Sequence, residues 1–324
     1  MNIVYACDDK FVGIMGISIT SLFEMNKDVL EIIVYVIEDL VSNENKDRLQ
    51  KLALEYNRTI IFIPLKSISS CLVGLCCDRG GESQFSRLFL SKVVPESCDR
   101  VLYMDCDTLI RGSLADLYST DFEGNVICGV LDCISKQHRA RIHISPEEIY
   151  INSGILLIDM FLWRNLNIEN KITNIIQKYE GRVPYADQGI VNLALMNKIK
   201  LVHPRYNCMS IFTVFNYDEL LEFRQPSACE SSFKIKEARE NPTIVHYVTL
   251  FCLTRPWVKG GCGPYYDEWR ACKARSLWAD EPLCSNNKRK YLRFLSILYR
   301  KLPRWMTLPI IGFLHSRVKP ILLK

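Results

Sequence analysis

The stretch Arg100-Val-Leu-Tyr-Met-Asp-Cys-Asp107 joins a short apolar run to a pair of aspartates. The run at residues 101–104 predicts a buried strand, so both aspartates fall at its C-terminal end, where open α/β sheets bind ligands. Residues i and i+2 of an extended chain point the same way, so Asp105 and Asp107 can reach one cation. Such an oxygen-rich half-site suits Mg²⁺ or Mn²⁺ with positions left for phosphate oxygens.

The spacing of this pair is weak evidence by itself, because a chain with this many aspartates contains one Asp-x-Asp by chance. Its position is stronger evidence, since two carboxylates buried after an apolar strand are costly without a cation. On these residues alone, a metal site and a solvated loop pair both stay open. An EF-hand is excluded, because residues 108–111 supply no further acid and no turn glycine.

Strand and helix patterns alternate outward from this segment, which predicts an α/β fold with a mostly parallel sheet covered on both faces. Ser42 is placed to cap a helix whose apolar residues recur at helical spacing. The other expected helices span residues 14–23, 168–179 and 188–196. The expected strands span residues 3–6, 31–37, 60–64, 101–104, 126–131 and 155–158.

Composition indicates an ordinary folded chain, with 324 residues that are 48% hydrophobic and 24% charged. The first residues meet acids early and lack a basic region, so we interpret them as a strand rather than a secretory signal. The 14 cysteines include no Cys-x-x-Cys pair, and we expect reduced thiols in the cytoplasm. No apolar run reaches the roughly 20 residues of a membrane span.

Several further motifs occur in a fixed order with the aspartate segment. They are Ile3-Val-Tyr-Ala-Cys-Asp-Asp9, Ser86-Arg-Leu-Phe-Leu90, Tyr150-Ile-Asn-Ser-Gly-Ile-Leu-Leu-Ile158, Tyr185-Ala-Asp-Gln188, Arg205-Tyr-Asn207 and His246-Tyr247. Together they resemble the retaining glycosyltransferases of family 8, the group that contains glycogenin and the bacterial lipooligosaccharide α-galactosyltransferases. The resemblance implies a GT-A fold, a Rossmann-like domain that binds a nucleotide-sugar at the C-terminal edge of its sheet.

The same resemblance implies roles for individual residues. Ala6 and Asp8 are expected to contact the uridine of the donor, and Arg255 its diphosphate. His246 is expected to complete a metal site with the two aspartates, and a nitrogen ligand beside two carboxylates favours Mn²⁺ over Mg²⁺. Gln188 and Asp187 are the expected catalytic residues. The expected donor-binding set is Ala6, Asp8, Arg87, Asp105, Asn152, Ser153 and Arg255, and the metal set is Asp105, Asp107 and His246.

Structural alternatives stay open for most of these residues. Asp8 fits a turn or helix cap, and Asp187 fits the N-cap of the following helix. Arg87 fits a structural ion pair, and isolated amides such as Asn152 and Gln188 are commonly turn or cap residues. Arg255 also fits a surface charge.

The chain departs from the family pattern at several positions. Lys10 follows the opening aspartates where a neutral residue is usual, and Gly189 replaces an acid after Asp-Gln. The C-terminal motif carries Thr249 in place of glycine, about three extra residues, and Arg255 in place of lysine. Arginine keeps the positive charge and can grip a diphosphate in a bidentate manner, with Lys259 a weaker substitute. The remodelled stretch leaves two functions open.

The first is transfer of galactose or glucose from a UDP-sugar to a glycan or other hydroxyl acceptor, with the anomeric configuration retained. The alternative is a catalytically impaired protein that binds a nucleotide-sugar. A nucleotidyltransferase is disfavoured, because no glycine-rich basic loop follows the first strand.

The C-terminal segment differs from the rest in charge. Residues 285–324 hold ten lysines or arginines and no acid, which leaves a net charge of −5 on the remainder of a +5 chain. Aromatic and aliphatic residues alternate with these charges, as in interfacial anchors for anionic lipid. We therefore divide the chain into a catalytic domain, 1–282, and a basic amphipathic segment, 283–324, that attaches it to the inner face of the cell membrane. A helical lid packed on the domain is the second interpretation. Nucleic-acid binding is disfavoured, because the body has no basic stripe.

Overall fold

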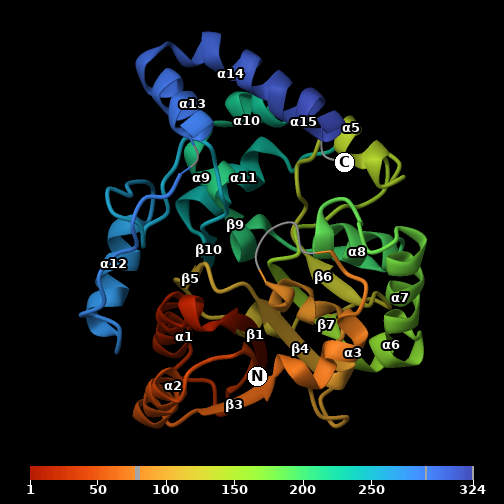
Figure 1. Ribbon diagram of the computed structural model, residues 1–324, viewed down its shortest axis with the longest axis vertical. Coiled ribbons are helices and arrows are strands. Elements are labelled where there is room, and N and C mark those ends of the chain that lie inside the picture. Colours follow the sequence, from red (N-terminus) through yellow and green to blue (C-terminus); the bar gives the residue numbers. More distant parts are fainter. Residues whose placement is uncertain (77–80, 289, 323–324) are drawn as a thin grey trace.

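The centre of the molecule is a seven-stranded sheet of order β3-β2-β1-β4-β7-β6-β8 (Figure 1). The computed structural model describes residues 1–76, 81–288 and 290–322, so Arg289 and Lys324 of the basic segment lie outside it. Strand β7 is antiparallel to both neighbours, and the other pairs are parallel. The predicted mostly parallel α/β fold is confirmed. The strands are β1 Asn2–Asp8, β2 Ile33–Asp39, β3 Thr59–Pro64, β4 Arg100–Met104, β6 Ile127–Gly129, β7 Ile155–Asp159 and β8 Ile199–Leu201.

All the predicted strands occur, but two of them are shorter in the structure than predicted. Strand β2 begins at Ile33, and β6 covers only Ile127–Gly129 of the expected 126–131. The ladder of β6 ends early because the next residues bond to a different segment: Leu131 forms an isolated bridge with Ile151. These bonds place residue 132 close to the loop that carries Asn152 and leads into β7, which is important for the site.

Helices cover both faces of the sheet, as the alternation along β1 requires. Val4 faces one hydrophobic core, whereas Ile3 and Tyr5 face another. Helices α6 (Met160–Asn165), α7 (Ile168–Lys178) and α8 (Ala186–Ala194) contribute to the first core. Helices α1 (Val12–Met25) and α2 (Asn43–Glu55) contribute to the second. Ser42 caps α2, as predicted, by accepting a hydrogen bond from the backbone N–H of Asn45.

A second, three-stranded sheet adjoins the end of β4. It consists of β5 (Thr108–Ile110), β10 (Ile244–His246) and β9 (Cys208–Met209). Because β5 and β10 pair antiparallel, His246 lies opposite Thr108. The small sheet thereby brings a histidine from late in the chain next to the aspartate pair.

Short helices connect these elements and extend the body. A 3₁₀ segment, η3, spans Glu82–Leu88 and carries the predicted arginine. The remaining helices of the body are α3 Ser69–Leu72, α4 Ala115–Tyr118, α5 Lys136–Arg141, α9 Ser210–Val214, α10 Tyr217–Arg224, α11 Ser232–Glu240 and α12 Tyr266–Arg275.

The C-terminal segment folds into helices that lie along α10 and α5 at the top of Figure 1. Tyr299, Leu308 and Ile311 are buried in the same hydrophobic core as residues of α9 and α10. The hydroxyl of Ser316 donates to backbone carbonyls at the end of α10. The segment thus has an inner face packed on the body, as the lid interpretation expects. Its elements are α13 Lys290–Lys301, α14 Arg304–Phe313, a π-helical turn Leu314–Val318 and α15 Lys319–Leu322. Within the described ranges, no helix is long and apolar enough to cross a membrane.

Gly312 permits the contact between α14 and α10. A Cβ atom at this position would stand 2.4 Å from the carbonyl oxygen of Glu222. We expect Gly312→Ala to lower the free energy of unfolding by about 1–3 kcal/mol, because backbone cannot move aside cheaply. Chemical denaturation measures this loss, and proteolysis should release the C-terminal helices faster.

The matched control is Gly112→Ala, whose Cβ would meet Thr243 at an ordinary 3.6 Å. Equal stability of both variants would contradict the docked arrangement of α14.

Candidate functional site

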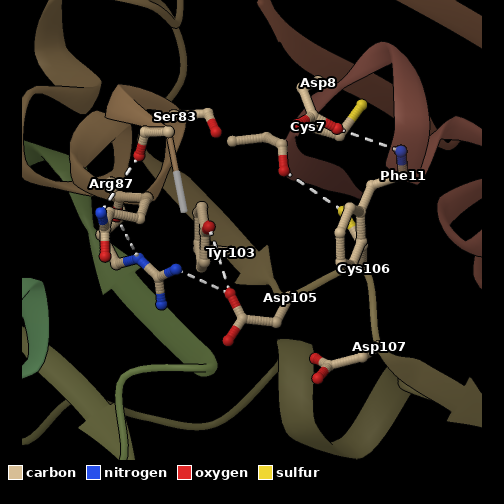
Figure 2. Close-up of a pocket in the computed structure, with 12 residues that line it drawn as sticks. Cys7, Asp8, Phe11, Ser83, Arg87, Tyr103, Asp105, Cys106 and Asp107 are labelled. Carbon is tan, nitrogen blue, oxygen red and sulfur yellow. Dashed lines mark hydrogen bonds and ion pairs between the residues drawn. The ribbon is translucent and has the colours of Figure 1, made fainter. Parts of the chain in front are cut away.

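A pocket of about 190 Å³ opens at the C-terminal edge of the large sheet (Figure 2). The ends of β1 and β4 and the 3₁₀ segment η3 form its walls, because the carboxyl ends of parallel strands meet at one edge. Five residues expected to bind the donor or the metal line it: Ala6, Asp8, Arg87, Asp105 and Asp107. The structure therefore brings residues from three separate motifs into one cavity.

Arg87 is the buried cation of this pocket. Its guanidinium lies 2.7 Å from Asp105 Oδ1 and 3.2 Å from Asp187 Oδ2, and it packs over the ring of Tyr103. It also donates to the backbone carbonyl of Ser153. Burial disfavours the charge, but the two carboxylates outweigh it and raise the pKa of Arg87. Arg87 thus forms ion pairs with both carboxylates, and this pairing holds Asp105 beside Asp187.

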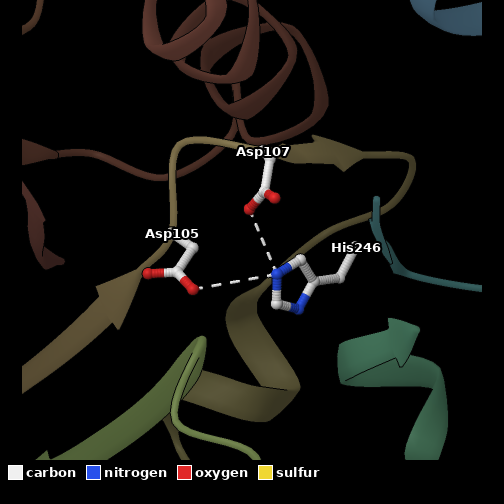
Figure 3. A group of neighbouring side chains, drawn as sticks. All are labelled: Asp105, Asp107 and His246. Carbon is white, nitrogen blue, oxygen red and sulfur yellow. Dashed lines mark hydrogen bonds and ion pairs between the residues drawn. The ribbon is translucent and has the colours of Figure 1, made fainter. Parts of the chain in front are cut away.

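Asp105, Asp107 and His246 form a cluster whose ligand atoms all lie within 4.8 Å of one another (Figure 3). The Nε2 atom of His246 is 3.1 Å from Asp107 Oδ1 and 3.7 Å from Asp105 Oδ2. A solvated loop pair does not describe these aspartates, since they line a pocket and face a buried histidine. Two carboxylates and one imidazole nitrogen suit Mn²⁺ or Mg²⁺.

Two neighbouring residues determine how the side chains of this cluster are arranged. Gly154 has no side chain where a Cβ would stand 2.3 Å from the His246 ring and 2.8 Å from Asp105 Oδ2. Asn207 Oδ1 lies 2.8 Å from Nδ1 of His246. The amide of Asn207 uses its nitrogen to donate to Asn152, so its oxygen must accept from Nδ1–H. In the neutral ring, Nε2 then keeps its lone pair and faces both aspartates, as a metal ligand requires.

The two aspartates differ in proton affinity. Burial raises the pKa of Asp105 in spite of Arg87, and the charge of Asp107 adds to the rise. Burial also acts on Asp107, but His246 and Arg255 outweigh it and lower its pKa to about 2. A cation bound between them therefore competes with a proton mainly at Asp105.

A chain of hydrogen-bonded amides leads away from His246. From Asn207 it passes to Asn152, whose Nδ2 donates to Gln188 Oε1 at 3.0 Å. Gln188 in turn donates through Nε2 to Asp132 Oδ2 and to the hydroxyl of Tyr150, each at 3.1 Å. Every polar atom of the Gln188 side chain is thus engaged, so its amide has one orientation.

Two of the structural alternatives, a helix cap at Asp187 and a surface charge at Arg255, are wrong. Asp187 is not the N-cap of α8, because Tyr185 holds that position; the Asp187 carboxylate accepts from Ser153 Oγ at 2.8 Å and pairs with Arg87. Arg255 is not a free surface charge, since it lies 3.2 Å from Asp107 Oδ2 and over the ring of Trp257.

Asp8 has both properties considered for it. Its Oδ1 accepts from the backbone N–H of Phe11 at 3.1 Å and caps the 3₁₀ segment Asp9–Phe11. The same residue lines the pocket next to Ala6.

Some residues of the site were not predicted from the sequence. Asp132 and Arg224 form an ion pair that continues the amide chain, and Asn207 orients the histidine. Asn207 lies in one of the ordered motifs, and Asp132 follows a predicted buried strand, as the aspartate pair does. The position of Asp132 after a predicted strand could therefore have identified it as a site residue. Arg224, at the end of a surface helix, has no such signal.

Solved structures and curated proteins establish the class. The galactosyltransferase LgtC, crystallised with donor and acceptor sugar analogues, matches with a TM-score of 0.72 at 20% identity, over 91% of this chain and 99% of that chain. That likeness shows that the fold is GT-A.

The model for glycosyltransferase family 8 matches residues 2–260, so the chain belongs to this family. Its relatives include general stress protein A of Bacillus subtilis, 27% identical over 86% of this chain and 94% of that protein. Lipopolysaccharide 1,2-glucosyltransferase of Escherichia coli is 24% identical over 87% of this chain and 80% of that enzyme.

Asn207 orients the ring of His246, and the affinity of the protein for a cation tests this role. We expect Asn207→Leu to weaken Mn²⁺ binding roughly 10- to 100-fold, because the imidazole loses the partner that fixes its tautomer and ring angle. Electron paramagnetic resonance of free Mn²⁺ measures the affinity, and circular dichroism checks the fold.

Asn287→Leu, at an exposed position, is the control and should bind as the unchanged protein does. If Asn207→Leu bound Mn²⁺ with unchanged affinity, the role of the amide chain would be wrong.

Proposed function

We propose that this chain transfers galactose or glucose from a UDP-sugar to a hydroxyl of a glycan acceptor, with retention of anomeric configuration. The observation that carries the proposal is the Asp105–Asp107–His246 cluster at the rim of the sheet-edge pocket. Membership of family 8 supports a transferase, and the cluster lies at the C-terminal edge of the sheet, where open α/β sheets bind ligands.

The pocket offers separate surfaces to the parts of the donor. Small Ala6 lets the backbone of β1 approach a uracil ring, and Asp8 supplies an acceptor for its N–H. Arg87 and Asp187 lie deeper, beside Ser153, and can bond sugar hydroxyls. Carboxylates hold the buried Arg87 on both sides, so its guanidinium is already oriented before the donor binds.

Asp105, Asp107 and His246 would hold Mn²⁺, with Mg²⁺ as the alternative cation. When bound, the cation supplies positive charge to the diphosphate of the donor. The ligand set supports this choice, because the imidazole nitrogen favours Mn²⁺ over Mg²⁺.

Arg255 supports the departure of UDP. Its guanidinium lies beside Asp107 and is held by the hydroxyl of Thr249 at 2.7 Å. From there it can stabilise charge that develops on the leaving phosphate. The two departures from the family motif thus act together, since Thr249 positions the arginine that replaces lysine.

Gln188 and Asp187 support the reacting sugar rather than attack it. The Gln188 amide is a poor nucleophile, and its hydrogen bonds hold it in one orientation. We infer a front-face substitution: the acceptor oxygen bonds to the anomeric carbon as the bond to the phosphate oxygen breaks. The acceptor proton moves to that departing oxygen. Asp187 forms an ion pair with Arg87, and its carboxylate would lie beside an oxocarbenium-like sugar.

Substitution of Asp105 tests the proposal. With Mn²⁺ and a panel of UDP-sugars, we expect UDP release from UDP-galactose or UDP-glucose, faster with a glycan acceptor. Asp105→Asn should lower the rate at least ~100-fold, because it removes a charged ligand from the cluster. Asp116→Asn, at an exposed helix position, should keep the full rate.

Tight UDP-sugar binding without any turnover would favour the alternative, a nucleotide-sugar-binding protein. Full activity of Asp105→Asn would remove the metal role.

We also propose that the C-terminal helices attach the protein to an anionic membrane surface, which places it on the cytoplasmic face. Phe294 is 61% exposed and Trp305 is 76% exposed, and both lie among basic residues that have no acidic neighbours in sequence. Other exposed apolar side chains of these helices are Tyr291, Ile297, Met306, Ile310 and Phe313. Aromatic rings mixed with positive charge favour the headgroup region of a bilayer.

Liposome flotation tests this attachment. We expect the double change Phe294→Ser and Trp305→Ser to lower binding to anionic vesicles roughly tenfold, because two large side chains no longer enter the interface. Phe233→Ser is the matched control, since Phe233 is 73% exposed but lies on α11 of the body. Unchanged flotation of the double variant would contradict the proposal.

A further inference from the structure

A second pocket, of about 140 Å³, lies where the C-terminal segment meets the body. We call it the junction pocket. Strand ends, α5, α8 and α10 supply most of its lining, and the C-terminal segment supplies two residues. The lining residues are Asp132, Ile134, His138, Tyr150, Tyr185, Gln188, Arg224, His315 and Lys319. Gln188 of this pocket accepts a hydrogen bond from the backbone N–H of Ser153, and the Ser153 carbonyl accepts from Arg87 of the donor pocket, so the two pockets are connected through these residues.

The charge of the junction pocket is positive. Arg224 and Lys319 contribute two cations, and Asp132 is the one carboxylate among the described lining residues. Both oxygens of Asp132 are already engaged, one by Arg224 and one by Gln188. Arg141 adds a further charge close by, where it donates to the backbone carbonyl of Pro320. A ligand that enters this pocket therefore meets the side chains of Arg224 and Lys319.

Several polar atoms around this pocket are buried without a hydrogen-bond partner among the described residues. They are Nε of Arg224, Nδ1 of His315 and the hydroxyl of Tyr185. A buried donor without a partner costs about 1–3 kcal/mol, so such groups usually have a function. Three such polar atoms in the lining of one small pocket indicate a ligand that is rich in acceptor oxygens.

Burial and the same cations lower the pKa values of the two imidazoles in the pocket. The rings of His138 and His315 stack with centroids 5.5 Å apart. Burial and then the charge of Arg224 lower the pKa of His138 to about 3 and that of His315 to about 2. Both rings are therefore neutral near pH 7, and an anion between them and Arg224 would offset the positive charge of Arg224.

We propose that the junction pocket binds an oxyanion, a phosphate ester or a carboxylate, that is part of the acceptor glycan. The inference rests on the proposed transferase function and names a class of acceptor for it. The anion lies on the far side of Gln188 from the metal cluster, so its contacts orient the acceptor hydroxyl toward the donor sugar. His315 and Lys319 make the C-terminal segment part of acceptor recognition, in addition to its outer, membrane-directed face.

Inorganic phosphate is the first probe, because its binding needs no turnover. The full chain has five histidines, so ¹³C-labelled imidazole signals are few and assignable. With UDP and Mg²⁺ filling the donor pocket, phosphate should shift the His138 and His315 signals in a saturable manner. Lys319→Met should weaken this binding at least ~10-fold, which is the loss of one charged contact. Lys301→Met, an exposed position on α13, should bind phosphate normally.

Arg224→Gln provides a second variant and should also weaken phosphate binding, provided that its melting temperature shows a folded protein. The proposal is overturned if phosphate at tens of millimolar moves neither imidazole signal. It is equally overturned if Lys319→Met and the unchanged protein bind phosphate alike.

A transfer assay distinguishes the two sources of the oxyanion. Matched acceptors are a neutral glycoside, its phosphate ester and its uronic-acid counterpart. We expect kcat/KM to be at least ~10-fold higher for one of the anionic acceptors, and Lys319→Met to reduce that preference. Equal kcat/KM for all three acceptors would overturn the acceptor role. Absence of donor turnover would instead contradict the proposed transferase, and the phosphate titration would still test the pocket.

Discussion

One directional chain of hydrogen bonds, from His246 through Asn207 and Asn152 to Gln188, determines how the site is arranged. Each amide accepts from one neighbour and donates to the next, so no member can rotate without breaking two bonds. A buried polar network that is fully satisfied is rigid, whereas one with a missing partner is costly. The orientation of the imidazole at one end and of the Gln188 amide at the other is therefore set together.

This chain also explains how distant segments act on one site. The small sheet delivers His246 to the aspartate pair through its antiparallel pairing with β5. Gly154 leaves the space that the imidazole and Asp105 occupy. At the far end, Asp132 pairs with Arg224, whose backbone carbonyl accepts a hydrogen bond from Ser316 of the C-terminal segment. The C-terminal helices, the ion pair and the amide chain thus form one continuous set of hydrogen-bonded groups.

Much of this site could be predicted from the sequence, because local rules place its parts. Ala6, Asp8 and Asp105 lie at or just beyond the C-terminal ends of apolar strands, and parallel strands end at one edge of a sheet. Other features depend on contacts between remote segments. Asn207 and His246 are 39 residues apart, and no local pattern says that one orients the other. Likewise, the positive charge and interleaved apolar residues of the C-terminal segment indicated an interfacial segment or a lid, but which face packs on α10 depends on shape at Gly312.

Diffraction at the manganese absorption edge tests the central claim most directly, with crystals grown in Mn²⁺ and UDP. Anomalous scattering locates the cation without reference to the protein atoms. The account predicts one strong peak in bonding contact with carboxylate oxygens of Asp105 and Asp107 and with Nε2 of His246. Nδ1 of the same ring should remain on Asn207. A peak at Nδ1, or no peak at the cluster while UDP is bound, would contradict it.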